Sequence, residues 1–250
     1  MRAALIGYGR MGRMVAECMA EQGDLAVAGI VDTDQLPSLA DVPSPDVAID
    51  FSFPGDLEDV LSVARRRHIP LVIGRTGLDD ARRAQIERAA QDIPIVCAGN
   101  FSVGVAVMRR MARQMAEALG EGFDIEIVEA HHRMKKDAPS GTAAMLVDAV
   151  DPGGRREVVH GRDGFAVRTQ GEIGVHALRG GSVCGDHTVY FLGDMEQLSI
   201  GHRAESRRVF ALGALRAARF VADQPAGLYD MDDVLFGAQD AKEGTADGCV

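Results

Sequence analysis

The sequence predicts an α/β protein in which an N-terminal, Rossmann-type, doubly wound parallel sheet carries an inserted α+β domain. Two observations lead to this expectation. Short apolar segments alternate with amphipathic helical segments through the first hundred residues, which is typical of a parallel sheet with helices on both faces. After Asn100 the pattern changes to one long helix and a series of alternating segments separated by turns, which indicates a more open sheet.

The first part begins with an apolar strand over residues 2–7, which runs into a glycine turn. A helix is expected next because apolar side chains follow at the spacing of one helix face, namely Met11, Met14, Val15, Cys18 and Met19. Alternating strands and helices are then expected, with strands at 25–32, 46–52, 70–74 and 93–98 and helices at 56–68 and 79–91.

The second part begins with a long amphipathic helix, and a Gly/Arg-rich stretch at 152–171 is expected to be a loop with little regular structure. Its expected helices are 103–119 and 141–149, and its expected strands are 123–130, 173–179, 183–193 and 195–203. A helix at 205–222 and a short helix at 230–236 precede a tail that we expect to be frayed. We therefore assign 1–101 and 207–250 to a dinucleotide-binding domain and 102–206 to the insertion.

Composition excludes several classes of protein. Of the 250 residues, 46% are hydrophobic and 26% charged, which does not fit a collagen-like, disordered or disulfide-scaffold protein. We find no apolar run long enough for a membrane span and no signal peptide, so we expect a cytoplasmic protein. The net charge of -10 argues against a general nucleic-acid surface. The four cysteines are widely spaced, which favours reduced thiols over a zinc site.

A dinucleotide-binding turn is expected directly after the first strand, where the chain reads Gly7-Tyr8-Gly9-Arg10-Met11-Gly12. Asp32 follows 20 residues after Gly12, where a carboxylate accepts hydrogen bonds from the adenosine ribose. No Arg or Lys follows Asp32 before Arg65, so NADH is favoured over NADPH, with Arg10 as the alternative partner for a 2′-phosphate. The alternative without a ligand is a plain strand-to-helix turn.

Two more loops follow expected strands of the same sheet and are candidates for the nicotinamide half of the cofactor. They read Gly74-Arg75-Thr76-Gly77 and Ala98-Gly99-Asn100-Phe101. Because the carboxyl ends of parallel strands face the ligand crevice, both loops are expected to line it. Each loop on its own is equally consistent with an ordinary turn.

Proton donors and anion-binding groups are densest between Glu129 and Thr142, where His131, His132, Lys135 and Lys136 lie within six residues. Ser140 is expected to cap a helix, so the amides of Ser140, Gly141 and Thr142 would face an incoming carboxylate. The alternatives are a solvated basic loop and a metal site at the two histidines, which lacks a third ligand at the usual spacing. We expect no bound metal.

The use of lysine separates this segment from the rest of the chain. Only three of the 27 basic residues are Lys, and two of the three are adjacent here. Arg cannot replace Lys where a proton must be given up. The remaining histidines are expected to be isolated and structural, namely His68, His160, His176, His187 and His202. The arginine triplet 65–67 ends a helix, where positive charge suits the helix dipole, so it is assigned no ligand.

Several segments together resemble the dihydrodipicolinate reductase family over nearly the whole chain. They are the turn at 7–13, Asn100 to Val105, Glu129 to Ala143, Leu178 to Gly181, Gly185 to Thr188 and Gly227 to Met231. The resemblance implies a tetrameric, NAD(P)H-dependent reductase of diaminopimelate and lysine synthesis whose inserted domain binds substrate and builds the oligomer.

The resemblance also implies residue roles. His131 and Lys135 match the family's proton donors, and the substrate contacts match His132, Ser140, Gly141 and Thr142. The cofactor contacts match Gly7 to Gly12, Asp32, Gly74 to Thr76 and Ala98 to Phe101. The substrate would be a cyclic conjugated imine with two carboxylates, which needs a hydride, cations and a proton.

The chain departs from the family pattern at four points. The glycine turn is one residue shorter than in many relatives, Asp32 stands where Glu is common, Arg75 replaces a usual Thr, and Met134 replaces a frequent His. Three other functions are considered: a different nicotinamide dehydrogenase on the same architecture, a paralogue that reduces a related dicarboxylate, and a non-enzymatic NADH sensor.

Overall fold

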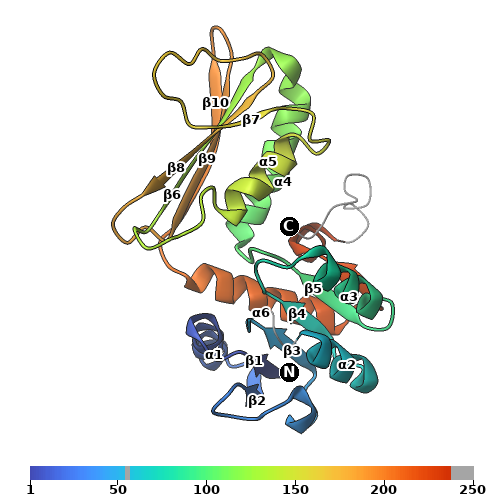
Figure 1. The fold of residues 1–250 in the computed structure, drawn as a ribbon. Helices are drawn as coiled ribbons and strands as arrows, with labels where there is room; N and C mark the ends of the chain where they lie inside the picture. Colours follow the sequence, from blue (N-terminus) through green and yellow to red (C-terminus); the bar gives the residue numbers. More distant parts are fainter. Residues whose placement is uncertain (54–56, 238–250) are drawn as a thin grey trace. The chain divides into compact units, whose positions relative to one another are not determined.

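A computed structural model describes residues 1–53 and 57–237, which form two compact units (Figure 1). The first unit comprises Met1–Val103 and Arg207–Val250, and the second comprises Gly104–Ser206. The expected frayed tail, with Lys242 and Cys249, lies outside the described residues. No helix in the described parts of the chain is long and apolar enough to cross a bilayer.

The first unit is built on a parallel sheet with strand order β11-β5-β4-β3-β1-β2, which confirms the expected doubly wound architecture. The strands are β1 (Arg2–Ile6), β2 (Ala26–Val31), β3 (Val47–Asp50), β4 (Leu71–Ile73), β5 (Pro94–Cys97) and β11 (Gly227–Tyr229). The three-residue strand β11 was not expected. It adds to the free edge of β5 after the last long helix.

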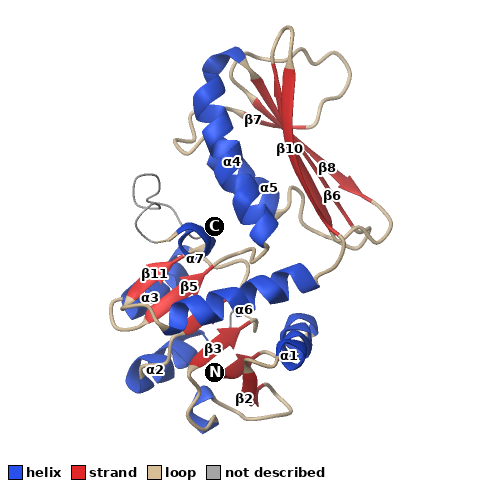
Figure 2. Ribbon diagram, turned by 180° about the vertical axis from the view of Figure 1, so that it is seen from behind, coloured by secondary structure: helices blue, strands red, loops and turns tan. Residues whose placement is uncertain are grey.

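Helices cover both faces of this sheet (Figures 1 and 2). They are α1 (Arg10–Gln22), α2 (Leu57–Arg67), α3 (Asp80–Ala90), α6 (Arg208–Ala222) and α7 (Met231–Phe236). Burial follows the expected apolar stripe of α1, where Val15, Cys18 and Met19 are buried. Helix α6 packs closely on the segment after β5, because a Cβ on Gly213 would lie 1.7 Å from the Phe101 carbonyl oxygen.

The strand order reverses direction at β1. Strand β2 pairs with one side of β1, and β3, the next strand in the chain, pairs with its other side. In doubly wound sheets, ligands bind outside the carboxyl ends of the strands at such a point. The glycine turn after β1 and the segment after β3 meet there, because a Cβ on Gly7 would lie 2.7 Å from the Ser52 backbone. Gly7 also has φ +81°, which L-residues rarely adopt.

The second unit contains a mixed sheet of order β10-β9-β6-β8-β7. Its strands are β6 (Asp124–His131), β7 (Val158–His160), β8 (Ile173–Arg179), β9 (Gly185–Leu192) and β10 (Gln197–Ala204). Strand β7 lies within the stretch 152–171 that we expected to be irregular, and it pairs in parallel with β8. The expectation was wrong there because pairing with β8, rather than apolar alternation, makes it a strand.

Helices α4 (Val103–Leu119) and α5 (Gly141–Val150) lie on one face of the second sheet (Figure 2). Odd-numbered side chains of β6 and β9 are buried on this face, where Ile125, Ile127 and Val189 pack with Leu146 of α5. Glu129, His131 and His187 continue the same alternation beyond the apolar cluster. The end of β6 therefore carries buried polar groups, and this positions the site described next.

Candidate active site

Glu129 is the centre of a buried polar network at the carboxyl end of β6. Its side chain is 0% exposed and accepts four hydrogen bonds. The donors are His131 Nδ1 at 2.6 Å, the Ser140 amide at 3.0 Å and two nitrogens of Arg179 at 2.7 Å each. Burial acts to raise the pKa of Glu129, but the hydrogen bonds from Arg179 and His131 outweigh it and hold the pKa below its ordinary value. The carboxylate is therefore ionised at neutral pH.

His131 is neutral in this environment. Burial lowers the pKa of His131 from its ordinary value, and the hydrogen bond to Glu129 offsets only part of that effect. An ionised carboxylate only accepts hydrogen bonds, so Nδ1 carries the ring proton. The other nitrogen, Nε2, faces a bare backbone, because a Cβ on Gly185 would lie 3.2 Å from it.

Ser140 links the same network to helix α5. Its hydroxyl oxygen accepts from the Ala143 amide at 3.1 Å, which confirms the expected helix cap. Its own amide donates to Glu129, so this amide points into the protein. The expectation that the Ser140 amide would face a ligand was wrong, because Glu129 needs that donor. Gly141 is exposed and Thr142 is half-buried in the first turn of α5.

His187 was expected to be isolated, and the structure corrects this. Its Nε2 lies 3.0 Å from the Ser140 hydroxyl oxygen, and its ring stands edge-on to His131 with centroids 5.1 Å apart. Burial lowers the pKa of His187 to about 4. Alternation along β9, which puts Gly185 and His187 on the helix-covered face, is the sequence signal that could have placed it here.

Lys135 extends from the loop that connects β6 to α5. Its Nζ donates to Asp137 Oδ2 at 2.7 Å, and its side chain is 21% exposed. The ammonium group is also near enough to His131 to help lower the pKa of that ring. Lys136 and Met134 are exposed, and His132 is half-buried.

Arg179 holds this loop against the end of β8. Besides Glu129, its guanidinium donates to the Asp137 carbonyl oxygen at 2.6 Å. Two backbone hydrogen bonds complete the attachment: Gly180 donates to the His131 carbonyl, and Arg133 donates to the Gly181 carbonyl. Sequence reasoning gave Arg179 no role in the site, because only the pairing of β6 with β8 brings it opposite His131.

The first unit provides the cradle expected for a dinucleotide. A Cβ on Gly12 would lie 2.0 Å from the Gly7 carbonyl oxygen, so only glycine allows this turn to lie against α1. Gly9 caps α1 and has open space where a Cβ would be, which leaves room for a pyrophosphate at the helix N-terminus. The glycine turn and the N-terminus of α1 therefore fit a dinucleotide cofactor.

Asp32 follows β2 and lies against this turn. Its carboxylate accepts from the Tyr8 amide at 2.6 Å and from the Thr33 amide at 2.8 Å. These backbone hydrogen bonds lower the pKa of Asp32 below its ordinary value, so it is a charged acceptor at the position expected for the ribose. Arg10 is exposed at the start of α1.

Arg75 has a buried side chain. Its guanidinium and the Asp50 carboxylate are both 0% exposed and form an ion pair of 2.7 Å. It also donates to the Phe53 carbonyl oxygen at 2.7 Å. The ion pair holds this side chain in place, because Asp50 would otherwise be a buried, unpaired charge, and the expected contact of Arg75 with the cofactor stays a prediction.

The other expected cofactor residues fall into two groups. Half-buried or exposed are Gly7, Tyr8, Gly9, Met11, Asp32, Gly74, Thr76, Ala98, Gly99 and Asn100. Phe101 is buried and stands edge-on to the Phe51 ring at 5.8 Å, so its side chain belongs to the core. Gly74 lies against Phe51 as well, since a Cβ there would be 2.2 Å from that ring. The loops after β3, β4 and β5 thus pack together.

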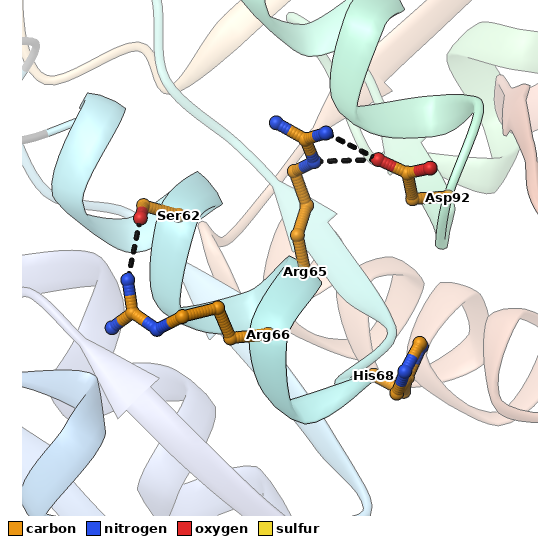
Figure 3. Close-up of a pocket in the computed structure, with 5 residues that line it drawn as sticks. All are labelled: Ser62, Arg65, Arg66, His68 and Asp92. Carbon is orange, nitrogen blue, oxygen red and sulfur yellow. Dashed lines mark hydrogen bonds and ion pairs between the residues drawn. The ribbon is translucent and has the colours of Figure 1, made fainter.

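A cavity in the first unit lies near the amino ends of β4 and β5, away from the carboxyl ends where the crevice is expected (Figure 3). Its lining residues come from the C-terminal end of α2 and the turn before β5, namely Ser62, Arg65, Arg66, His68 and Asp92. Arg65 pairs with Asp92 at 2.5 Å and Arg66 donates to Ser62 at 2.7 Å. These cations are used within the protein, and we assign no ligand there. Among the described residues, no group of three or more His, Cys, Asp or Glu side chains could hold a metal ion.

Comparison with known proteins identifies the family. Residues 1–101 match the family model described as dihydrodipicolinate reductase, N-terminus, and residues 104–235 match dihydrodipicolinate reductase, C-terminus. The chain belongs to the dihydrodipicolinate reductase family. The fold class, the oxidoreductase class and the reductase step of diaminopimelate and lysine biosynthesis, expected from the sequence, are confirmed by this membership.

Relatives with the name 4-hydroxy-tetrahydrodipicolinate reductase are similar over most of their length. The protein from Rubrobacter xylanophilus is 46% identical, with 91% of this chain and 95% of the relative covered. The protein from Caldanaerobacter subterraneus is 42% identical, with 91% and 94% covered. A dipicolinate-bound dihydrodipicolinate reductase from a Paenisporosarcina species has the same fold, with a TM-score of 0.76 at 21% identity over 94% of this chain and 99% of that one.

The buried neutral His187 makes stability depend on pH. Its folded pKa of about 4 lies below the roughly 6.5 of an unfolded histidine, so the unfolded chain binds more protons between these values. The contribution of the neutral His187 ring to the free energy of unfolding is complete above pH 6.5 and falls as the solution is acidified. We expect the wild-type advantage over His187→Gln in the free energy of unfolding to shrink by about 2 kcal/mol from pH 7.5 to pH 5. Urea unfolding of both proteins measures this, and a constant difference would contradict it.

Proposed function

We propose that this chain uses NADH, in preference to NADPH, to reduce dihydrodipicolinate to tetrahydrodipicolinate. Dihydrodipicolinate is the cyclic conjugated imine that forms from 4-hydroxy-tetrahydrodipicolinate. The observation that carries the proposal is that the end of β6 and the loop into α5 hold His131, on Glu129, and the Lys135 ammonium group, on Asp137, before the first turn of α5. The names of the relatives, and the dipicolinate bound to a structural neighbour, support the choice of a dicarboxylate.

The first unit is proposed to hold the cofactor. The amides of Gly7 to Gly12 and the N-terminus of α1 would bind the pyrophosphate, and Asp32 would accept hydrogen bonds from the adenosine ribose. The loops 74–77 and 98–101 would line the nicotinamide half through their backbone. When bound, NADH supplies the hydride. The charged Asp32 would repel a 2′-phosphate, and Arg75 is engaged with Asp50.

The second unit is proposed to hold the substrate. Gly141 and Thr142 present amides in the first turn of α5, where the helix dipole favours a carboxylate. His132 and the Thr142 side chain are the further candidates for the two carboxylates. Ser140 would act by capping α5 and tying it to Glu129, since its amide and hydroxyl are already used. These contacts orient the ring for hydride addition.

Lys135 is proposed to supply the proton. Addition of hydride to the conjugated imine leaves an electron-rich enamine, which must be protonated at carbon. The ammonium group, held by Asp137, donates that proton, and His131 Nε2 relays a replacement to the resulting amine. A non-enzymatic NADH sensor would need the first unit but not Lys135 or His131, so a turnover assay distinguishes a sensor from the proposed reductase.

A homotetramer in the cytoplasm completes the proposal. The even-numbered side chains of β6 and β9 face away from α4 and α5, and Leu178 of the neighbouring strand β8, which is 53% exposed, extends this face. Such a face suits burial between symmetric copies. The reduced thiols Cys18 and Cys184 fit a reducing compartment.

Light scattering tests the tetramer. It should give four times the chain mass of 26.7 kDa, and a monomer mass would contradict the tetramer.

The reaction and the cofactor preference are tested in one assay. We expect NADH absorbance to fall when the product of the preceding synthase step is added, with kcat/KM for NADH at least equal to that for NADPH. Asp32→Ala should shift the ratio toward NADPH, while Asp34→Ala, which removes the same charge from an exposed neighbour, should not. No oxidation above background would contradict the reaction. A tenfold preference for NADPH, or about 1.4 kcal/mol, would contradict the role of Asp32.

The role of Lys135 is tested by replacing it with the cation that the rest of this chain uses. Arg keeps the charge but releases its proton too poorly to be an acid, and general acid catalysis is typically worth 10²- to 10⁴-fold. We expect kcat to fall by roughly that range in both Lys135→Arg and Lys135→Ala. The Kd for NADH should not change, because the cofactor groups lie in the first unit.

Lys136→Arg is the matched control, since Lys136 is the exposed neighbour with no assigned proton. We expect it to keep most of the wild-type kcat. If Lys135→Arg also stayed within threefold of wild type, Lys135 would be an electrostatic clamp and His131 the remaining candidate donor.

A further inference from the structure

Glu129 has no role in the mechanism above, yet its carboxylate determines how His131 is presented. It is fully buried, and its contacts are all with donors: Arg179 from β8, the Ser140 amide and His131 Nδ1. A carboxylate that orients a working imidazole through Nδ1 is a recurring arrangement in proteins. Neither the family resemblance nor the names of the relatives assign this residue a function.

We propose that Glu129 is a positioning residue for the reductase reaction, which fixes His131 as the Nδ1–H tautomer and leaves Nε2 free to relay the proton. Arg179 is proposed to fix Glu129 in turn. The inference rests on the proposed role of His131.

The tautomer follows from hydrogen-bond chemistry. A neutral imidazole carries one N–H, and at 2.6 Å from a charged carboxylate oxygen that proton belongs on Nδ1. The opposite tautomer would set the Nδ1 lone pair against the carboxylate lone pairs. Nε2 is then an acceptor beside Gly185, where a side chain would crowd it, since a Cβ there would lie 3.2 Å from Nε2. Only this tautomer can take up a proton at Nε2.

Arg179 keeps the orienting group charged and in place. Its two nitrogens bind separate oxygens of Glu129, which is a bidentate geometry with a defined plane. The groups that face His131 are Glu129 on its own strand, Arg179 on β8, His187 on β9 and Lys135 in the loop. The charges on Lys135 and Arg179 lower the pKa of the ring, and Glu129 raises it.

The chain contains its own control for a carboxylate–histidine pair. Three residues earlier on β6, Glu126 Oε2 lies 2.6 Å from His176 Nε2. That pair lies on the opposite face of the sheet, and Glu126 also binds Arg162 at 2.8 Å. Both carboxylates lie on β6, and each binds a histidine and an arginine. The pairs differ in the face of the sheet, in the ring nitrogen that is bound and in whether the histidine is a proposed proton relay.

The test compares Glu129→Gln with Glu126→Gln, each alone and with His131→Asn. We expect Glu129→Gln to lower kcat roughly 100-fold, within the range for lost acid–base catalysis, with the Kd for NADH unchanged. In the His131→Asn background the same substitution should change kcat less than threefold, because a residue that acts through His131 has nothing left to orient. Glu126→Gln should stay within threefold of its parent in both backgrounds.

Nitrogen chemical shifts of the His131 ring provide a readout independent of turnover. We expect the wild-type ring to be protonated at Nδ1 and the Glu129→Gln ring to be a mixture of tautomers. A wild-type protein that does not turn over would contradict the proposed function, whereas the tautomer would still test this inference. Should Glu129→Gln fail to fold, Glu129→Asp keeps the charge beside Arg179 with a shorter reach, and it should lower kcat at least tenfold.

Two results would overturn the inference. One is a folded Glu129 variant with kcat within threefold of wild type. The other is an equal loss of kcat with and without His131, which would make Glu129 a structural residue only.

Discussion

The candidate site depends on the burial of one negative charge. Removing the Glu129 carboxylate from water is costly unless donors surround it, and the donors come from β6, from β8 and from the residue that caps α5. The loop between β6 and α5 is therefore attached at both ends, through His131 and Ser140. Arg179 attaches its middle through the Asp137 carbonyl. The positions of Lys135 and the first turn of α5 follow from this arrangement.

The first unit uses a second buried carboxylate in the same way. Asp50 pairs with Arg75 and also accepts from the amide and hydroxyl of Ser52, which lies against Gly7 of the glycine turn. Withdrawing Arg75 to bind a phosphate would leave Asp50 buried and unpaired, at a cost of about 3 to 5 kcal/mol. The unusual Arg therefore supports the segments after β3 and β4, and Asp32 is the charge next to the proposed ribose site.

Sequence periodicity predicted the parallel sheet, the helices and the placement of both candidate regions, because these depend on local patterns of apolar residues. It failed for β7 and β11, which are three residues long and exist through pairing with a neighbour. It also failed for the directions of Arg75, the Ser140 amide and His187. The directions of Arg75 and of the Ser140 amide are set by Asp50 and Glu129, which no local pattern shows. Alternation along β9 indicates the face on which His187 lies, but not its partner Ser140.

The environments of the two proposed proton-transfer groups separate their roles. Burial lowers the pKa of His131, so the ring rests neutral with an acceptor at Nε2. Lys135 instead forms an ion pair with Asp137, and the hydrogen bond from Lys135 holds the pKa of that carboxyl below its ordinary value despite burial. In the proposed reaction Lys135, held by Asp137, would act as the acid, and His131, held by Glu129, would accept and return a proton at Nε2.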